Sequence, residues 1–581
     1  MSNVKSPCPQ QALSCARGTP RAMNSYDAIV IGAGHNGLVA ATYLSRAGWR
    51  TLVLERESRP GGAVLSEELT RPGLIHDVFA TNMNLFRGSP VAAELGAELE
   101  RHGLEYATSA LPFANVFPDG SALRVHQDRA KTLDGLRAHD ARDAAGWEAL
   151  DAEYERLAPA LFRLYGARLT PRVLTRLAVE ESRALGASGL TALARLLVSS
   201  TRELADTYLV SREAKALLAC WGMHLDFAPD VSGGAMFPFL EAFTDMRTGI
   251  ALARGGASRL IDALVALLRE AGGELRLGAE VSRVVVEGGR ASAVELAGGE
   301  RIVARRAVIA NLTPTLLYGR LLGADAVAPA IGRAAAGYSY GPGTMMVHLA
   351  LSGPIPWRAG ADLAGFAYVH IAPYLDDLAQ MYAQASAGLL PAEPMLVVGQ
   401  TSAVDPTRSA GTEHVVWVQV RALPSVIAGD ALGEIAARNW DEAAEAYANR
   451  VLAKLERYAP GAGRLVLDRA VLSPADLERR NPNLSGGDSI GGSMHLRQNF
   501  WFRPFPGVRD YESGVNGLLT VGASTWPGAG VNALSGYNVA QKLTETRTPR
   551  TDDARLALDG LRAAGRAAGG AASTALRRRR S

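Results

Sequence analysis

The sequence has little cysteine, little lysine and no long apolar run, and each shortage narrows what the chain can be. Its cysteines are Cys8, Cys15 and Cys220, so the body of the chain can form neither a disulfide framework nor a CxxC metal site, and a reducing compartment fits. No stretch approaches the roughly 18 uninterrupted apolar residues of a membrane-spanning helix. Lys plus Arg total 61 against 58 Asp plus Glu, a balance that predicts no nucleic-acid partner.

Lysine is rare among the basic residues. The chain has five lysines and 56 arginines, and no lysine lies between Lys215 and Lys454. Together with abundant Ala and Gly, this bias favours a bacterial source. We therefore expect a cytoplasmic protein with peripheral membrane contact, and a mitochondrial matrix protein if the source is eukaryotic. The ten histidines form no HxxxH pattern or His/Cys cluster, so no metal site is expected.

The length of the chain and the composition of its two ends predict several domains flanked by two tails. The chain has 581 residues, of which 48% are apolar and 20% charged, enough for a large core divided among several domains. Residues 1–24 carry no acidic residue and no apolar signal region, which predicts a disordered tail, with a transit peptide as the alternative. Residues 551–581 are rich in Ala, Gly and Arg. They are predicted to be a low-complexity basic tail, with a weak tether to anionic lipid as the alternative.

A dinucleotide-binding pattern begins near residue 26. A short apolar run, Tyr26–Ile31, is followed by GAGHNG at 32–37, a small-residue helix and a second apolar run at Thr51–Leu54 that ends in Glu55. This is GxGxxG in its full context, with a strand before it, a helix after it and an acidic residue about 20 positions on. The whole βαβ unit is far more specific than the glycines alone.

Each residue of this pattern has a physical role. Gly32 permits the tight turn, Gly34 lets the backbone approach a pyrophosphate, and Gly37 lets the helix pack against the strand. The N-terminus of the helix offers free N–H groups and the positive end of its dipole to the phosphates. Glu55 can accept hydrogen bonds from ribose hydroxyls. His35, inside the loop, is interpreted as a packing or solvent-facing residue.

Two later segments are expected to return to the same site. In the first, residues 254–311, a helix with Leu260, Ile261, Leu264, Leu267 and Leu268 on one face precedes short strands at Val281–Glu287, Ala291–Leu296, Arg301–Val303 and Ala307–Asn311. In the second, a strand from Gly517 runs into a glycine-rich loop ending at Gly530, and a helix is predicted from about Val531. This loop is not a second fingerprint, because position 533 is Ala.

Residues after Glu55 carry a family resemblance. Arg56 is followed by Gly61, Gly62 and Ala63, which resembles the extended FAD fingerprint of amine oxidases and carotenoid desaturases. Amine oxidases usually have Arg where this chain has Ala63. Further matches are HGLEY at 102–106, SPADLE at 473–478 and GGSMH at 491–495. Over Tyr26–Lys542 the chain resembles the phytoene desaturase type of FAD-dependent oxidoreductase, in the branch with β-carotene ketolases and the pyridine nucleotide-disulfide oxidoreductase domain-containing flavoproteins.

The resemblance implies a fold and a cofactor. The fold would be α/β, a discontinuous Rossmann-like FAD-binding domain of the amine oxidase and glutathione reductase type with an inserted α+β substrate domain. Residues 25–100, 245–320 and 485–550 would form the FAD domain, and residues 101–244 and 321–484 the substrate domain. The expected FAD-binding residues are Gly32, Ala33, Gly34, Gly37, Glu55, Arg56, Gly61, Gly62, Ala63, Val281, Gly522, Ala523, Gly530 and Val531.

The expected activity is oxidation of a hydrophobic, isoprenoid or polyene-like substrate. Catalytic side chains are not identifiable; Trp526, His495 and Arg503 are candidates for lining the site, and Trp526 stands where relatives often have His. Aromatic and Met residues at 221–243 are either ordinary core or the wall of a substrate channel. With one fingerprint, we expect reoxidation by oxygen or a quinone rather than an NAD(P)H site. The alternatives are a flavin-binding regulatory protein and an amine oxidase-like enzyme; the oligomeric state is not predicted.

Overall fold

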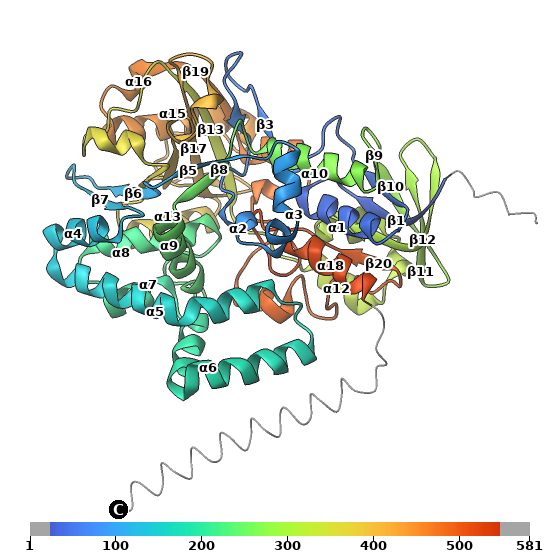
Figure 1. The fold of residues 1–581 in the computed structure, drawn as a ribbon. Coiled ribbons are helices and arrows are strands. Elements are labelled where there is room, and N and C mark those ends of the chain that lie inside the picture. Colours follow the sequence, from blue (N-terminus) through green and yellow to red (C-terminus); the bar gives the residue numbers. More distant parts are fainter. Residues whose placement is uncertain (1–23, 546–581) are drawn as a thin grey trace, which may run out of the picture.

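The computed structural model describes residues 24–545. The tails predicted at 1–24 and 551–581 lie outside these residues except for Asn24. Two seven-stranded sheets organise the chain, and Figure 1 shows them on opposite sides of the molecule, with a group of helices below the second sheet. None of the helices described is both long and apolar enough to cross a membrane.

The first sheet assembles strands from distant parts of the chain. Its order is β10-β11-β12-β1-β2-β9, and β20 pairs with β12. Strands β1, β2, β9, β12 and β20 run parallel, whereas β10 and β11 form an antiparallel extension beside β12. The bounds are β1 Ser25–Ile31, β2 Thr51–Leu54, β9 Glu274–Arg276, β10 Val281–Glu287, β11 Arg290–Leu296, β12 Arg301–Ala310 and β20 Leu518–Thr520.

Helices pack against this sheet through apolar faces. Helices α1 (His35–Arg46), α10 (Ser258–Glu270) and α18 (Leu534–Thr544) share one core with the inward residues of β1 and β12. The five apolar residues predicted on one face of α10 are all buried, with at most 1% of their surface exposed. The helical period of 3.6 places them on a single stripe, so this prediction is confirmed.

The second sheet has the order β19-β13-β17-β16-β14-β6-β7. One of its faces packs against α15 (Trp440–Tyr458), and the other faces the helices α5 (Ala141–Gly166), α8 (Arg212–Ala219) and α9 (Met236–Thr248). The bounds of its strands are β6 Phe113–Val116, β7 Ala122–Val125, β13 Gly343–Leu351, β14 Tyr368–Ile371, β16 Leu396–Gly399, β17 His414–Leu423 and β19 Val466–Leu472.

The remaining elements connect and cover the two sheets. They include the two-stranded pair of β5 (Tyr106–Ser109) and β8 (Ile250–Ala253), which joins segments on either side of the predicted domain boundary. The domain boundaries themselves remain a prediction. The other helices of eight or more residues are α3 Pro90–Arg101, α4 Arg129–His139, α6 Pro171–Val198, α7 Thr201–Tyr208, α12 Pro329–Ala336 and α13 Leu375–Ser386.

Three sequence-based element assignments were wrong in detail. Arg301–Ala310 is one continuous strand, because its first half pairs with β11 and its second half with β1 and β20. The sequence pattern over 190–210 predicts one helix, but the structure divides it at Ser199 and Ser200, where the Ser200 side chain and Glu203 form a capping box that starts α7. The last helix starts at Leu534 rather than near Val531, because Ala533 takes a left-handed conformation with φ of +60°.

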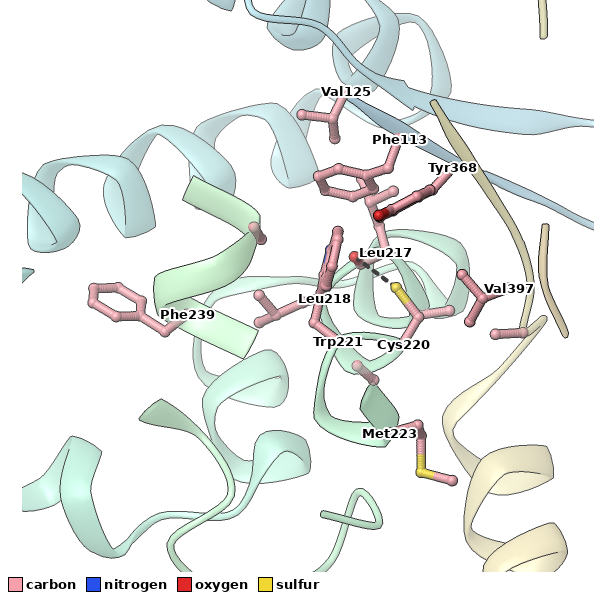
Figure 2. Packing of buried hydrophobic residues seen from close by; sticks show 14 of the residues in the cluster. Phe113, Val125, Leu217, Leu218, Cys220, Trp221, Met223, Phe239, Tyr368 and Val397 are labelled. Carbon is pink, nitrogen blue, oxygen red and sulfur yellow. Dashed lines mark hydrogen bonds between the residues drawn. The ribbon is translucent and has the colours of Figure 1, made fainter. Parts of the chain in front are cut away.

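The aromatic stretch 221–243 is mostly core. Trp221, Phe239 and Phe243 expose at most 2% of their surface, and Figure 2 shows Trp221 packed among Phe113, Leu218 and Tyr368. The ring of Phe239 lies 5.7 Å from that of Tyr154. Ordinary core, one of the two interpretations, therefore holds for these three residues, and the channel interpretation is wrong for them.

Candidate functional site

A cavity of about 570 Å³ lies where the first sheet meets the N-terminus of α1. It collects residues from the ends of β1, β2 and β12, from the start of β10, and from the segments 479–491 and 521–524. The carboxyl ends of parallel strands meet at one edge of a sheet, and this edge is where open α/β folds bind ligands.

The glycine loop forms one wall. Gly32 has a φ of +96°, which only glycine adopts readily, and its N–H donates to the Leu54 carbonyl over 2.7 Å. Gly34 precedes the first residue of α1 and no side chain caps the helix. The N–H groups of the first turn therefore remain for an anion, which a helix N-terminus stabilises.

Gly34 and Gly37 are required for different reasons. A Cβ on Gly37 would stand 2.3 Å from the backbone oxygen of Gly32, so this glycine allows the helix to pack on the strand. A Cβ on Gly34 would stand 2.9 Å from Nδ2 of Asn311, and Gly34 lines the cavity whereas Gly37 does not. The predicted division of roles between them is consistent with this geometry.

Glu55 lies at the end of β2 and faces the cavity. Its Oε2 accepts a hydrogen bond from the N–H of Ala33 over 2.8 Å, and its Oε1 accepts one from the N–H of Glu57 over 3.0 Å. Burial raises the pKa of Glu55 above its ordinary value, and these backbone donors oppose the rise. The carboxylate is thus fixed in place, with acceptor capacity left for the hydroxyls of a ribose.

Asn311 is a site residue that sequence reasoning missed. It follows β12 directly, and its amide lies among four glycines: Gly32, Gly34, Gly37 and Gly522 each would bring a Cβ within 3.5 Å of an Asn311 atom. Its Nδ2 donates to the Gly32 carbonyl over 3.5 Å. One sequence feature could have identified Asn311: it follows a buried parallel strand, and ligand-binding residues gather at the ends of such strands.

The predicted FAD-binding residues fall into two groups. Those that line the cavity are Gly32, Gly34, Glu55, Arg56, Gly62, Ala63, Val281, Gly522 and Ala523. Those that do not line it are Ala33, Gly37, Gly61, Gly530 and Val531. Ala33 and Gly61 support the wall from behind, since the Gly61 N–H donates to the Ala33 carbonyl. Gly530 and Val531 precede the helix by several residues because α18 begins later than predicted.

Arg503 organises the loops at the far end of the cavity. It is 4% exposed, and its guanidinium donates to the carbonyls of Gly492, Ser493 and Ala523 over 2.5–3.2 Å. These bonds join the loop that contains the GGSMH match to the loop after β20. Arg503 does not line the 570 Å³ cavity, so its candidate role is that of a positioning residue.

Trp526 and His495 also lie outside the wall of this cavity. The indole N–H of Trp526 donates to the Ala167 carbonyl over 3.0 Å, and its ring lies 5.3 Å from that of Phe500. Nε2 of His495 lies 2.8 Å from the carbonyl oxygen of Asp226 and 3.4 Å from its Oδ2. Neither side chain therefore touches the cavity directly. The sequence alone did not predict that residues within 479–491 form part of the cavity wall.

No cluster of three or more His, Cys, Asp or Glu side chains suited to a metal ion occurs within 24–545. The chemistry of the cavity is instead that of a dinucleotide: an uncapped helix N-terminus for phosphates, a fixed carboxylate for a ribose, and a second glycine loop at Gly522 for a further ring system. The residues present therefore fit FAD, and the fold and site define a flavoprotein oxidoreductase.

Comparisons with known proteins identify the family. The model of the flavin containing amine oxidoreductase family matches residues 37–465, and the chain belongs to this family. It is an FAD-dependent oxidoreductase. The pyridine nucleotide-disulfide oxidoreductase domain-containing protein 2 of Mus musculus is 29% identical over 92% of this chain and 96% of its own.

Other relatives have names that state a reaction. One subunit of the limonene dehydrogenase of Castellaniella defragrans is 25% identical over 89% of this chain and 94% of its own. The phytoene dehydrogenase of Streptomyces griseus is 28% identical over 90% of this chain and 96% of its own. Among solved structures, an oxidoreductase from Methanosarcina mazei shares the fold, with a TM-score of 0.58 at 18% identity over 88% of this chain and 99% of its own.

Proposed function

We propose that the protein dehydrogenates an apolar, isoprenoid or polyene-like substrate, and that oxygen or a quinone reoxidises the flavin. When bound, FAD accepts a hydride and so supplies the redox chemistry. The relatives named for limonene and phytoene support the substrate class, because both compounds are isoprenoid hydrocarbons.

The observation that carries this proposal is the aromatic group beside the Gly522 loop. Ser524 lines the cavity, and two residues on, Trp526 packs with Tyr165 and Phe500 at ring distances of 5.6 and 5.3 Å. A second apolar cluster, Phe227, Ile490, Met494 and Ala529, adjoins the same loops. Each buried CH₂ is worth about 0.8 kcal/mol, so a long apolar chain would bind here with few polar contacts.

The chain's own residues would bind, orient and exclude water rather than react. Arg503 fixes the two loops that meet at Ala523. Burial lowers the pKa of His35, in the glycine loop, to about 4, so its imidazole is neutral at pH 7 and adds no charge beside the phosphates. An apolar substrate resides in a membrane, so we further propose peripheral contact of the protein with lipid.

The test is anaerobic reduction of the bound flavin, followed by its visible absorbance. Limonene and phytoene, supplied in vesicles, should bleach the flavin, whereas putrescine and NADPH should not. Bleaching by putrescine alone would favour the amine oxidase-like alternative. No bleaching by any of these compounds or by a lipid extract would favour the flavin-binding regulatory protein. Flotation with vesicles of anionic and of neutral lipid tests the membrane contact.

A further inference from the structure

Arg421 is a cation next to the wall of the cofactor cavity, and none of the steps above uses it. It lies on β17, in the second sheet, and is partly buried. Its Nη1 donates to Oγ of Ser489 over 2.7 Å, and its Nε donates to Oε1 of Gln419 over 2.8 Å. Ser489 lines the cofactor cavity. Arg421 itself is not among the residues that line this cavity; it lies directly behind Ser489, on the side of the second sheet, and keeps part of its surface exposed.

No carboxylate pairs with this cation: within residues 24–545 Arg421 has no ion pair at 4.0 Å or less. The carboxylate whose charge most affects the pKa of Arg421 is that of Asp488. Both Asp488 oxygens instead accept hydrogen bonds from backbone N–H groups, those of Gly341, Ile490 and Gly492. Burial lowers the pKa of Arg421 to about 10, so the group is still charged at pH 7. Cations with most of their surface withdrawn from solvent, as here, are ordinarily paired.

The histidines beside Arg421 do not compensate the charge. Nε2 of His224 lies 3.0 Å from Nε2 of His370. Burial lowers the pKa of His224 well below its ordinary value, and the charges of His370 and Arg421 add to this; burial likewise lowers the pKa of His370 to about 3. Both rings are therefore neutral near pH 7.

The donors of Arg421 are only partly used. A guanidinium has five N–H groups, and among the described residues only one from Nε and one from Nη1 find protein acceptors. The end of the group, formed by Nη1 and Nη2, retains N–H groups on both nitrogens. That fork is the geometry that binds a carboxylate through two parallel hydrogen bonds.

We propose that Arg421 binds the carboxylate of a substrate whose remaining body is apolar. This inference rests on the proposed function, because it assigns a polar end to the substrate of the same site. A carboxylate at Arg421 would pair this partly buried cation and fix one end of the molecule, while the aromatic groups near Trp526 hold the rest. A carboxylate would also distinguish this protein's substrate from limonene and phytoene, the hydrocarbons in its relatives' names.

The test uses the FAD-loaded protein and three probes: farnesoic acid, farnesol and benzoate. Binding is followed through the change in absorbance of the bound flavin. We expect farnesoic acid to bind the wild type about tenfold or more tightly than farnesol. Arg421→Met should remove that difference and leave the Kd of farnesol unchanged. Arg421→Lys keeps the charge but not the fork, so it should recover part of the affinity. Arg333→Met, which removes an exposed arginine of α12, is the control for net charge and should change neither Kd.

Four outcomes would overturn the proposal. Equal affinity of the wild type for acid and alcohol would show that no carboxylate is recognised, while the apolar substrate class would stand. Equal weakening of both ligands by Arg421→Met, or loss of flavin from both Arg421 variants, would assign Arg421 to the cofactor or the fold. Absence of any binding would contradict this inference and the proposed function together. Arg421-dependent binding of benzoate without binding of either farnesyl compound would instead support the carboxylate site and reject only the long apolar chain.

Discussion

The amide of Asn311 occupies the space that a side chain on Gly34 would need, since a Cβ there would stand 2.9 Å from Nδ2. Gly34→Glu would place a carboxylate both against this amide and at the expected phosphate position. We expect the purified variant to be folded but colourless, as measured by flavin absorbance per protein and by circular dichroism. A yellow Gly34→Glu protein with full flavin occupancy would contradict the assignment of the phosphate site.

Gly37→Ala should lower the stability of the fold, because Gly37 packs against the strand and does not line the cofactor cavity. Its Cβ would stand 2.3 Å from the backbone oxygen of Gly32 and 3.2 Å from Cγ1 of Val30, and neither can move without shifting β1. Overpacking of this kind costs about 1–3 kcal/mol, so the melting temperature should fall. Gly96→Ala, in α3 with no atom within 4 Å of the new Cβ, is the matched control and should leave stability equal or higher.

Asn311→Asp keeps the shape of the side chain and changes its charge. A carboxylate beside Gly34 and Gly522 would face the anionic part of the cofactor, and at an effective dielectric of 20 two such charges at about 4 Å repel by about 4 kcal/mol. We expect FAD affinity to fall by at least about tenfold, measured by flavin release on dilution, with little change in secondary structure. Unchanged affinity would mean that Asn311 does not approach the phosphates.

Glu241 should make stability depend on pH. It lies on α9, has no hydrogen bond or ion pair within 24–545, and burial raises its pKa from 4.5 to about 7. The folded state then binds the proton more tightly than the unfolded state. The free energy of unfolding therefore falls as pH rises from about 4.5 to about 7. Burial, and then the charge of Glu241, also raise the pKa of Asp245 one turn further on.

Glu241→Gln removes this dependence. Relative to the wild type, the variant should gain little at pH 5 and gain most at pH 8, with the melting temperature higher by roughly a few degrees. Thermal unfolding at four pH values between 5 and 8 measures the difference. Glu68→Gln, at an exposed residue without an ion pair in the described part of the chain, should show no such trend. A gain at pH 5 equal to that at pH 8 would indicate that Glu241 is not titrating in this window.

Phe239→Asp and Phe237→Asp distinguish core from cavity wall. Phe239 is 1% exposed and packs against Tyr154 and Phe243, so a buried charge there should prevent folding, because an uncompensated carboxylate in an apolar site costs several kcal/mol. Phe237 is only partly buried, so its variant should fold and keep flavin. Soluble expression and flavin content measure both. A folded, yellow Phe239→Asp protein would restore the channel interpretation for this position.

The sequence by itself determined the local part of the FAD site. Gly32, Gly34, Gly37 and Glu55 lie within 24 positions of one another, and a strand, a turn and a helix at that spacing can close in only one way. The hydrogen bond from the Ala33 N–H to Glu55 follows from that closure. The family and its cofactor were therefore recognisable before the fold was known, and the period of the apolar residues predicted α10.

Only the tertiary structure decided which distant residues complete the cavity. Asn311 reaches Gly34 and Gly522 because β12 lies between β1 and β20, an order that no local pattern encodes. Ser489, in the loop after α17 (Pro474–Arg480), reaches Arg421 of β17 although 68 positions separate the two residues. Trp526, Arg503 and His495 have the residue types of an active site, yet none of them lines the cofactor cavity, and each has a polar atom within hydrogen-bond distance of a backbone carbonyl. A side chain's role depends on which partners the folded chain brings within about 3 Å, and for these residues the partners are up to several hundred positions away.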